Sequence, residues 1–174
     1  PMPAKPQGVD EGILRGMYLL RGAPKGDGPI VRLIGSGPSM VQVLDAVEKL
    51  EAYGIRSEIY SATSYGELRR EGLACDRWNR LHPSKTAKKP WVEQLLGNAE
   101  VPVVAVSDNM AAVPDMIRQW VRGHFTVLGT DGFGRSDTRE ALRRFFEIDG
   151  KAVALAALSS LARNGSLEAS VYEQ

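Results

Sequence analysis

The chain alternates between short apolar runs that are typical of strands and longer stretches whose apolar residues have helical spacing. The strand-like runs are residues 13–21, 30–34, 55–61, 101–107 and 125–128. In the clearest helical stretch the apolar residues recur every three or four positions, at Met40, Val43, Leu44, Val47 and Leu50. Strands that alternate with helices form right-handed crossovers. The order therefore predicts an α/β fold with an open, mostly parallel sheet covered by helices on both faces.

Turn and capping residues mark where the predicted helices begin and end. Pro38 suits the first turn of the helix that carries Met40, and Gly54 suits the position just past its end. Ser64 and Glu67 have the spacing of a capping box, which predicts a second helix near Leu68. The remaining expected helices are 114–121, with Met116, Ile117 and Trp120 facing inward, 138–146 and 151–163.

Two connecting regions are less regular. Residues 73–98 show a mixed pattern, and their large apolar residues are expected to tie them to the core: Trp78, Leu81, Trp91 and Leu95. Residues 24–29 contain Asp27 and Gly28, a dipeptide typical of tight turns. They predict a hairpin turn between the first two strands.

Four loops are expected to meet at one edge of the sheet, because the carboxyl ends of parallel strands lie together. They are residues 35–39, 61–64, 107–110 and 129–137. The last of them, GTDGFGRSD, holds three glycines and five polar or charged side chains directly after a strand-like run. Such a loop either caps the next helix or forms a recognition site. Its candidate contact residues are Asp131, Phe133, Arg135, Ser136 and Asp137.

Composition restricts the partners of the chain. With 174 residues and a formal net charge of +1, it is most simply one domain without the electrostatic signature of a nucleic-acid or membrane-surface protein. No apolar run reaches the roughly 18 residues of a transmembrane span, and no signal peptide is visible. Cys75 is the single cysteine, which fits a reducing cytoplasm. The chain opens with Pro1 and ends within a helical pattern, so we expect a fragment of a longer polypeptide.

The sequence contains no self-contained active site. His82, His124 and Cys75 are interpreted as structural, and a total of two histidines and one cysteine argues against a typical zinc site. No nucleophile elbow occurs. Residues 35–37 form a Gly-x-Gly turn before a helix that could bind an anion through free N–H groups, but the full dinucleotide spacing is absent.

Residues 128–137 resemble the Gly-x-Asp-x-Phe-Gly-x-Ser loop in the C-terminal domain of transketolases. The longer form, which ends in Gly-Arg-Ser-Asp, is similar to the homodimeric pyruvate dehydrogenase decarboxylating component. Other segments agree with that family, so the resemblance covers nearly the whole chain: 12–18, 33–37, 59–68 and 75–83.

The resemblance implies a three-layer α/β/α domain with a five-stranded mixed, mostly parallel sheet whose first strand is antiparallel. Residues 1–11 would be a linker or arm, and residues 12–174 the transketolase C-terminal-like domain. Enzymes of this family decarboxylate pyruvate on thiamine diphosphate and Mg and reductively acetylate the lipoyl group of an acyltransferase. Two preceding domains hold the cofactor across a homodimer interface. The Gly26-Asp27-Gly28 tripeptide resembles the opening of the thiamine diphosphate motif, but the asparagine pair that completes it is absent.

We therefore expect no catalytic, cofactor-binding or metal-binding residue in this chain. The loop with Asp131, Phe133, Arg135, Ser136 and Asp137 becomes a candidate interface to the other domains or to the homodimer partner. An alternative is a regulatory module that binds a small anion at the loops 35–39 and 129–137. A third possibility is docking of the dihydrolipoyl acyltransferase on the N-terminal arm and on the exposed charges of Arg69, Arg70 and Glu71.

Overall fold

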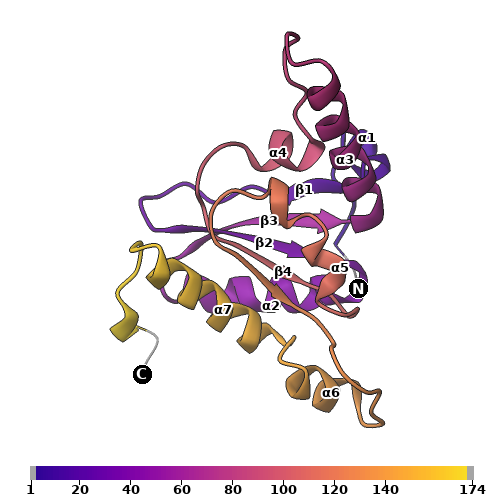
Figure 1. Ribbon diagram of the computed structural model, residues 1–174. Coiled ribbons are helices and arrows are strands. Elements are labelled where there is room, and N and C mark those ends of the chain that lie inside the picture. Colours follow the sequence, from indigo (N-terminus) through magenta and orange to yellow (C-terminus); the bar gives the residue numbers. More distant parts are fainter. Residues whose placement is uncertain (1–2, 172–174) are drawn as a thin grey trace.

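The computed structural model describes residues 3–171, which form three layers, with one sheet between two layers of helices (Figure 1). The strands are β1 (Met17–Arg21), β2 (Ile30–Gly35), β3 (Arg56–Ala62), β4 (Val103–Val106) and β5 (Phe125–Leu128). Their order across the sheet is β1-β3-β2-β4-β5. β1 runs antiparallel to β3, and the other neighbouring pairs are parallel. The predicted five-stranded mixed sheet with an antiparallel first strand is confirmed.

Helices cover both faces of the sheet. The α-helices are α1 (Asp10–Leu14), α2 (Met40–Glu51), α3 (Tyr65–Leu81), α4 (Trp91–Leu96), α5 (Ala112–Asp115), α6 (Arg139–Phe145) and α7 (Gly150–Arg163). Short 3-10 turns are η1 (Gly37–Ser39), η2 (Arg118–Trp120) and η3 (Ala169–Val171). No helix among residues 3–171 is long and apolar enough to cross a membrane.

The core has two halves, one on each face. On one face α2 and α7 pack against the inner strands, and the apolar stripe predicted for the helix after Pro38 is buried there at Met40, Val43, Val47 and Leu50. On the other face α3, α4 and η2 pack on the sheet through Leu68, Val92, Leu96 and Trp120. β4 is buried at all four residues, as expected for a central parallel strand.

The order of the strands across the sheet corrects the predicted hairpin at residues 24–29. β3 lies between β1 and β2 in the sheet, so β1 pairs with β3 and not with β2. The connecting loop therefore spans the width of one strand, and Arg56 Nε holds it by donating to the Gly28 carbonyl at 2.8 Å. Turn dipeptides mark a reversal but do not specify which strand becomes the neighbour.

Several boundaries also differ from those predicted. Residues 10–14 are helical, so the first strand begins at Met17 and not at residue 13. α3 continues to Leu81, whose side chain is exposed and does not tie residues 73–98 to the core. The helix predicted at 114–121 is split into α5 and η2, and Met116 faces solvent while Ile117 is buried.

A buried charge lies at the amino end of the sheet. Arg32 is 7% exposed, and its Nε donates to Glu58 at 2.9 Å while Nη1 donates to the Ala99 carbonyl at 3.1 Å. The Tyr60 hydroxyl donates to the same carboxylate at 3.0 Å, and burial raises the pKa of this phenol above its usual range. A buried arginine is tolerated only with such partners, so this cluster links β2 to β3 independently of apolar packing.

Candidate functional site

The loops that follow β2 and β4 are joined by three serine hydroxyls at the carboxyl edge of the sheet. Ser36 Oγ donates to Ser107 Oγ at 3.1 Å, and Ser39 Oγ donates to the Val106 carbonyl at 2.8 Å. The predicted meeting of the loops 35–39 and 107–110 is confirmed by these contacts. The same hydroxyls are thereby occupied within the protein, and Pro38 has no N–H group to offer to an anion.

The glycine-rich loop begins at this edge. Thr130 N and Oγ1 donate to the carbonyls of Asn109 and Asp108, both at 2.9 Å. The carboxylate of Asp131 accepts from Ala111 N at 3.1 Å. A Cβ at Gly129 would clash with the backbone of Ala111, so glycine is required where the two loops touch. The start of the loop is therefore fixed to the body of the protein.

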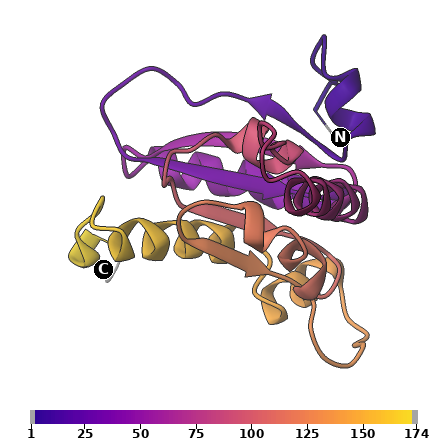
Figure 2. The same cartoon turned by 45° about the horizontal axis from the view of Figure 1, so that its top comes forward.

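Beyond Asp131 the chain leaves the sheet edge. Residues 131–140 are all exposed, and the loop and α6 project from the three-layer body in both orientations shown (Figures 1 and 2). Gly132 has a φ of 101°, a conformation that L side chains rarely adopt. Thr138 caps α6 by accepting from Ala141 N at 3.2 Å, yet no residue of α6 is buried.

This projecting region presents aromatic and arginine side chains to solvent. Phe133 is 95% exposed. The Arg135 guanidinium lies 3.9 Å from the centroid of the Phe145 ring, which meets Phe146 edge to face. A hollow of about 740 Å³ lies between the loop and α6, with Leu142 among its lining residues. Exposed aromatic and arginine side chains around an apolar hollow are typical of a surface that another protein covers.

The five candidate residues do not act as one unit. Asp131 belongs to the fixed start of the loop, and Asp137 accepts from Thr138 N at 2.6 Å, next to the helix cap. Phe133 and Arg135 form the exposed face, and Ser136 is exposed beside them. We call the surface formed by Phe133, Arg135, Leu142, Phe145 and Phe146 the loop–α6 surface.

The thiamine diphosphate motif is not formed here. Residues 26–28 lie in the connection before β2, whereas the strand-end loops lie after β2 and β4. Among residues 3–171 no group of three His, Cys, Asp or Glu side chains is placed to hold a metal ion.

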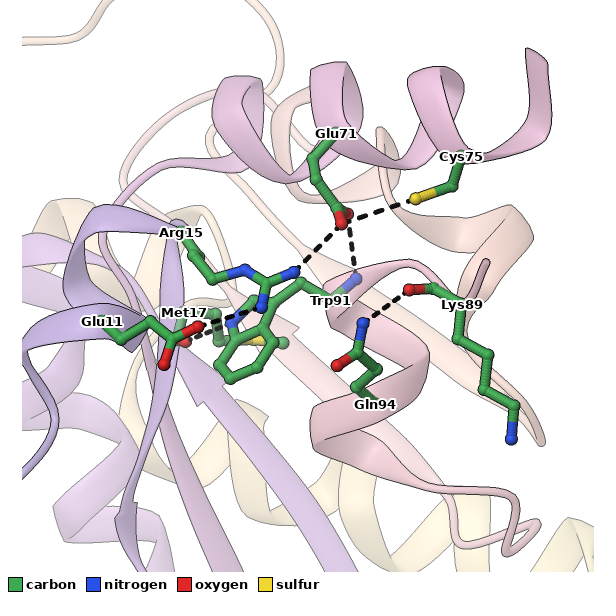
Figure 3. Close-up of polar contacts among 8 residues, drawn as sticks. All are labelled: Glu11, Arg15, Met17, Glu71, Cys75, Lys89, Trp91 and Gln94. Carbon is green, nitrogen blue, oxygen red and sulfur yellow. Dashed lines mark hydrogen bonds and ion pairs between the residues drawn. The ribbon is translucent and has the colours of Figure 1, made fainter. Parts of the chain in front are cut away.

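A polar cluster that joins α1, α3 and α4 was missed by the sequence interpretation (Figure 3). The Glu71 carboxylate accepts from Arg15 Nη2 at 3.1 Å and from Trp91 N at 2.9 Å. The Arg15 guanidinium lies 4.1 Å from the centroid of the Trp91 ring, whose Nε1 donates to the Met17 carbonyl at 2.8 Å. Glu71 is thus an internal anchor, which corrects its assignment as an exposed docking charge.

Cys75 lies one turn further along α3 and is buried, as the sequence interpretation expected for a structural thiol. Its Sγ donates to Glu71 at 3.5 Å. Burial raises the pKa of this thiol to about 11, and the Glu71 carboxylate adds to the shift. A thiol protonated at neutral pH is a poor nucleophile, so Cys75 has the properties of a packing residue.

The far end of α3 and the loop that follows it form a second projection, at the top of Figure 1. Asn79 pairs with the backbone of Lys88 in both directions, with Nδ2 donating at 2.9 Å and Oδ1 accepting at 2.8 Å. The His82 ring stacks on the Trp78 ring with their centroids 4.6 Å apart, and its Nδ1 lies 2.8 Å from the Trp78 carbonyl oxygen. Because Nδ1 faces a carbonyl oxygen, it carries the proton and donates.

The comparisons with known proteins agree with this fold. The family model for the transketolase-like TK C-terminal domain matches residues 16–149, and the chain belongs to this family. Solved structures show the same architecture. Transketolase from Campylobacter jejuni superposes with a TM-score of 0.59 at 20% identity, over 90% of this chain and 20% of that one. The enzyme from Leishmania mexicana gives 0.58 at 21% identity, over 91% and 20%.

Curated relatives point to one branch of the family. The chain is 48% identical to the pyruvate dehydrogenase E1 component of Pseudomonas aeruginosa over 99% of its length, which is 20% of the relative. It is 44% identical to the Escherichia coli K12 protein of the same name over 98% of its length, or 19% of the relative. The chain thus spans about a fifth of the length of the relatives that it matches.

Proposed function

We propose that this chain is the C-terminal domain of a pyruvate dehydrogenase E1-type enzyme and that it serves in assembly, with no catalytic residue of its own. The observation that carries the proposal is 48% identity to a pyruvate dehydrogenase E1 component across almost the whole chain. The parent enzyme would use thiamine diphosphate and Mg to decarboxylate pyruvate and would reductively acetylate lipoyl groups in the cytoplasm. The chain alone binds neither cofactor in this proposal.

The loop–α6 surface is the proposed contact with the remaining domains or with the homodimer partner. Phe133 and Phe145 expose large rings at a region whose own helix buries no residue. Burial of such rings against a partner removes apolar area from water and supports association. The small-anion alternative has less support, because the hydroxyls at residues 35–39 are already bonded and Asp108 lies beside them.

A reconstitution experiment tests the proposal. The Pseudomonas aeruginosa relative, truncated to lack the region that aligns with this chain, is mixed with the chain, and pyruvate decarboxylation is measured. We expect the chain to restore activity in a saturable way. The double variant Phe133→Ala/Arg135→Ala should require about tenfold more protein for half-restoration, because aromatic and arginine residues dominate interface energies.

The matched control is Leu14→Ala/Arg122→Ala, which removes an exposed apolar and a basic side chain away from the loop. It should restore activity like the unmodified chain. Equal restoration by both double variants would show that the loop–α6 surface is not the contact. Micromolar binding of thiamine diphosphate and Mg to the chain alone, measured by titration calorimetry, would contradict the assembly role itself.

A further inference from the structure

The second projection concentrates positive charge. Residues 77–92 contain no Asp or Glu, and they carry five cations: Arg77, Arg80, Lys85, Lys88 and Lys89. The other 17 Lys and Arg and all 21 Asp and Glu lie elsewhere, which leaves the rest of the chain at a formal charge of −4. The charge is therefore separated in space, although the whole chain is nearly neutral.

These cations are not neutralised within the protein. All five are exposed, and among residues 3–171 none of them forms an ion pair with a carboxylate. By contrast, Arg70 on the same helix pairs with Glu67, and Arg15 pairs with Glu71. The separation begins where α3 leaves the body of the protein. Its outer end and the loop stand free of the sheet in Figure 1.

The loop that carries three of the lysines is held in shape. Asn79 fixes the backbone of Lys88 by two hydrogen bonds, and the Lys88 ammonium lies 4.6 Å from the centroid of the Trp78 ring. The end of the loop is anchored where Trp91 N donates to Glu71. The start is anchored where Trp120 packs over Gly72 and donates to Asp76 at 3.1 Å. Charges held in this way lose less conformational entropy on binding than charges on a free loop.

We propose that the basic tip, residues 77–89, is a docking surface for an acidic segment of a protein partner. The tip projects from the body (Figure 1) and its charges are spread along a helix end and a loop, so it fits an extended chain of carboxylates and not a small anion enclosed in a pocket. The rest of the chain has a net negative formal charge. This charge limits the contact to the tip and disfavours binding of a long polyanion such as duplex nucleic acid. This surface is separate from the loop–α6 surface, which lies at the opposite end in Figure 1.

A binding measurement with a defined probe tests the inference. A fluorescein-labelled twelve-residue peptide with six glutamates separated by Gly and Ser is titrated with the chain, and anisotropy is recorded at two salt concentrations. The unmodified chain should bind and should weaken with salt. The variant Arg77→Gln/Arg80→Gln/Lys85→Gln/Lys89→Gln should bind about tenfold more weakly, because each exposed pair contributes modestly and the four act together.

The matched control removes the same total charge from scattered exposed positions: Arg69→Gln/Arg122→Gln/Lys151→Gln/Arg163→Gln. If this control binds the peptide within twofold of the unmodified chain, the result supports the basic tip as the docking surface. Equal weakening by both variants overturns it, because net charge alone would then explain the binding. No binding of the peptide by the unmodified chain, or tighter binding of a 20-base-pair duplex or of phosphatidylserine vesicles, also overturns it. Circular dichroism of each variant excludes unfolding as the cause.

Discussion

The protein has two projections from the same three-layer body, and they are stabilised in different ways. In the basic tip Asn79 pairs with the backbone of Lys88, and below the tip Trp91 N donates to Glu71 while Trp120 packs over Gly72. The loop–α6 surface is fixed at its start through Thr130 and Asp131 and at its end where Phe146 packs on the core, and between them α6 buries no residue. An element that buries nothing of its own depends on a partner for stability, whereas a clamped element keeps its shape alone. The two projections therefore suit different kinds of contact.

The largest expected difference is between Trp91, which anchors the loop of the basic tip, and Phe133 in the loop–α6 surface. Trp91→Ala removes ring packing, the bond to the Met17 carbonyl and the contact with Arg15, and should lower the free energy of unfolding by about 3 kcal/mol. Phe133→Ala should change it by less than about 0.5 kcal/mol, because that ring is solvated. Urea unfolding of both variants makes the comparison. Equal losses would mean that the exposed loop stabilises the isolated chain.

The reactivity of Cys75, at the base of the basic tip, can be compared with that of a cysteine placed at position 136 in the glycine-rich loop. With its pKa raised to about 11 from 9.0, Cys75 should react with a disulfide reagent at pH 8 about a hundredfold more slowly than in the urea-unfolded chain. A Cys75→Ser/Ser136→Cys variant should react at the unfolded rate, because position 136 is exposed. Fast labelling of Cys75 in the folded chain would show that the base of the basic tip opens readily.

The same thiol predicts a pH dependence. The folded state holds this proton more tightly than the unfolded state, so the stabilising contribution is fully present below about pH 9 and is lost as the pH rises through about 11. Unfolding of the unmodified chain should weaken over this range more than unfolding of Cys75→Ser. Identical pH profiles for the two proteins would contradict the raised pKa.

Gly129 lies in the fixed start of the glycine-rich loop and Gly134 in its exposed part, so substitutions at the two positions compare these parts. Gly129→Ala should cost about 2 kcal/mol, because the new Cβ must displace the backbone of Ala111. At Gly134 a Cβ meets nothing within 4 Å, so Gly134→Ala should change stability by less than about 0.5 kcal/mol. Thermal unfolding of both variants measures the difference. A large loss at Gly134 would show that the outer part of the loop packs on the body in solution.

Among the substitutions that are expected to remove a stabilising contact, the smallest effect is expected at Asn79 in the basic tip. Asn79→Ala removes two exposed hydrogen bonds to Lys88 and should cost about 1 kcal/mol or less. Amide hydrogen exchange at residues 82–89 should accelerate while exchange in the sheet stays unchanged. Unchanged exchange in that loop would show that Asn79 does not hold it, and the tip would then resemble the other projection.

Local sequence patterns determined much of this protein. Period and capping identified the five strands, the buried stripe from Met40 to Leu50, and the cap at Ser64, because these depend on residues close in the chain. The glycine-rich loop was also found from sequence, since three glycines in nine residues indicate a demanding backbone. The family resemblance supplied the antiparallel first strand, which periodicity does not specify.

Only the tertiary structure decided which distant groups meet. It placed β3 between β1 and β2, where the turn at residues 24–29 had suggested a hairpin. It placed the half-buried Glu71 carboxylate between Arg15 and Trp91, residues that lie 56 and 20 positions away, and so turned an apparent surface charge into an anchor. Burial and charge pairing depend on packing between elements, and a carboxylate on a helix has the same local pattern whether its partner is water or an arginine.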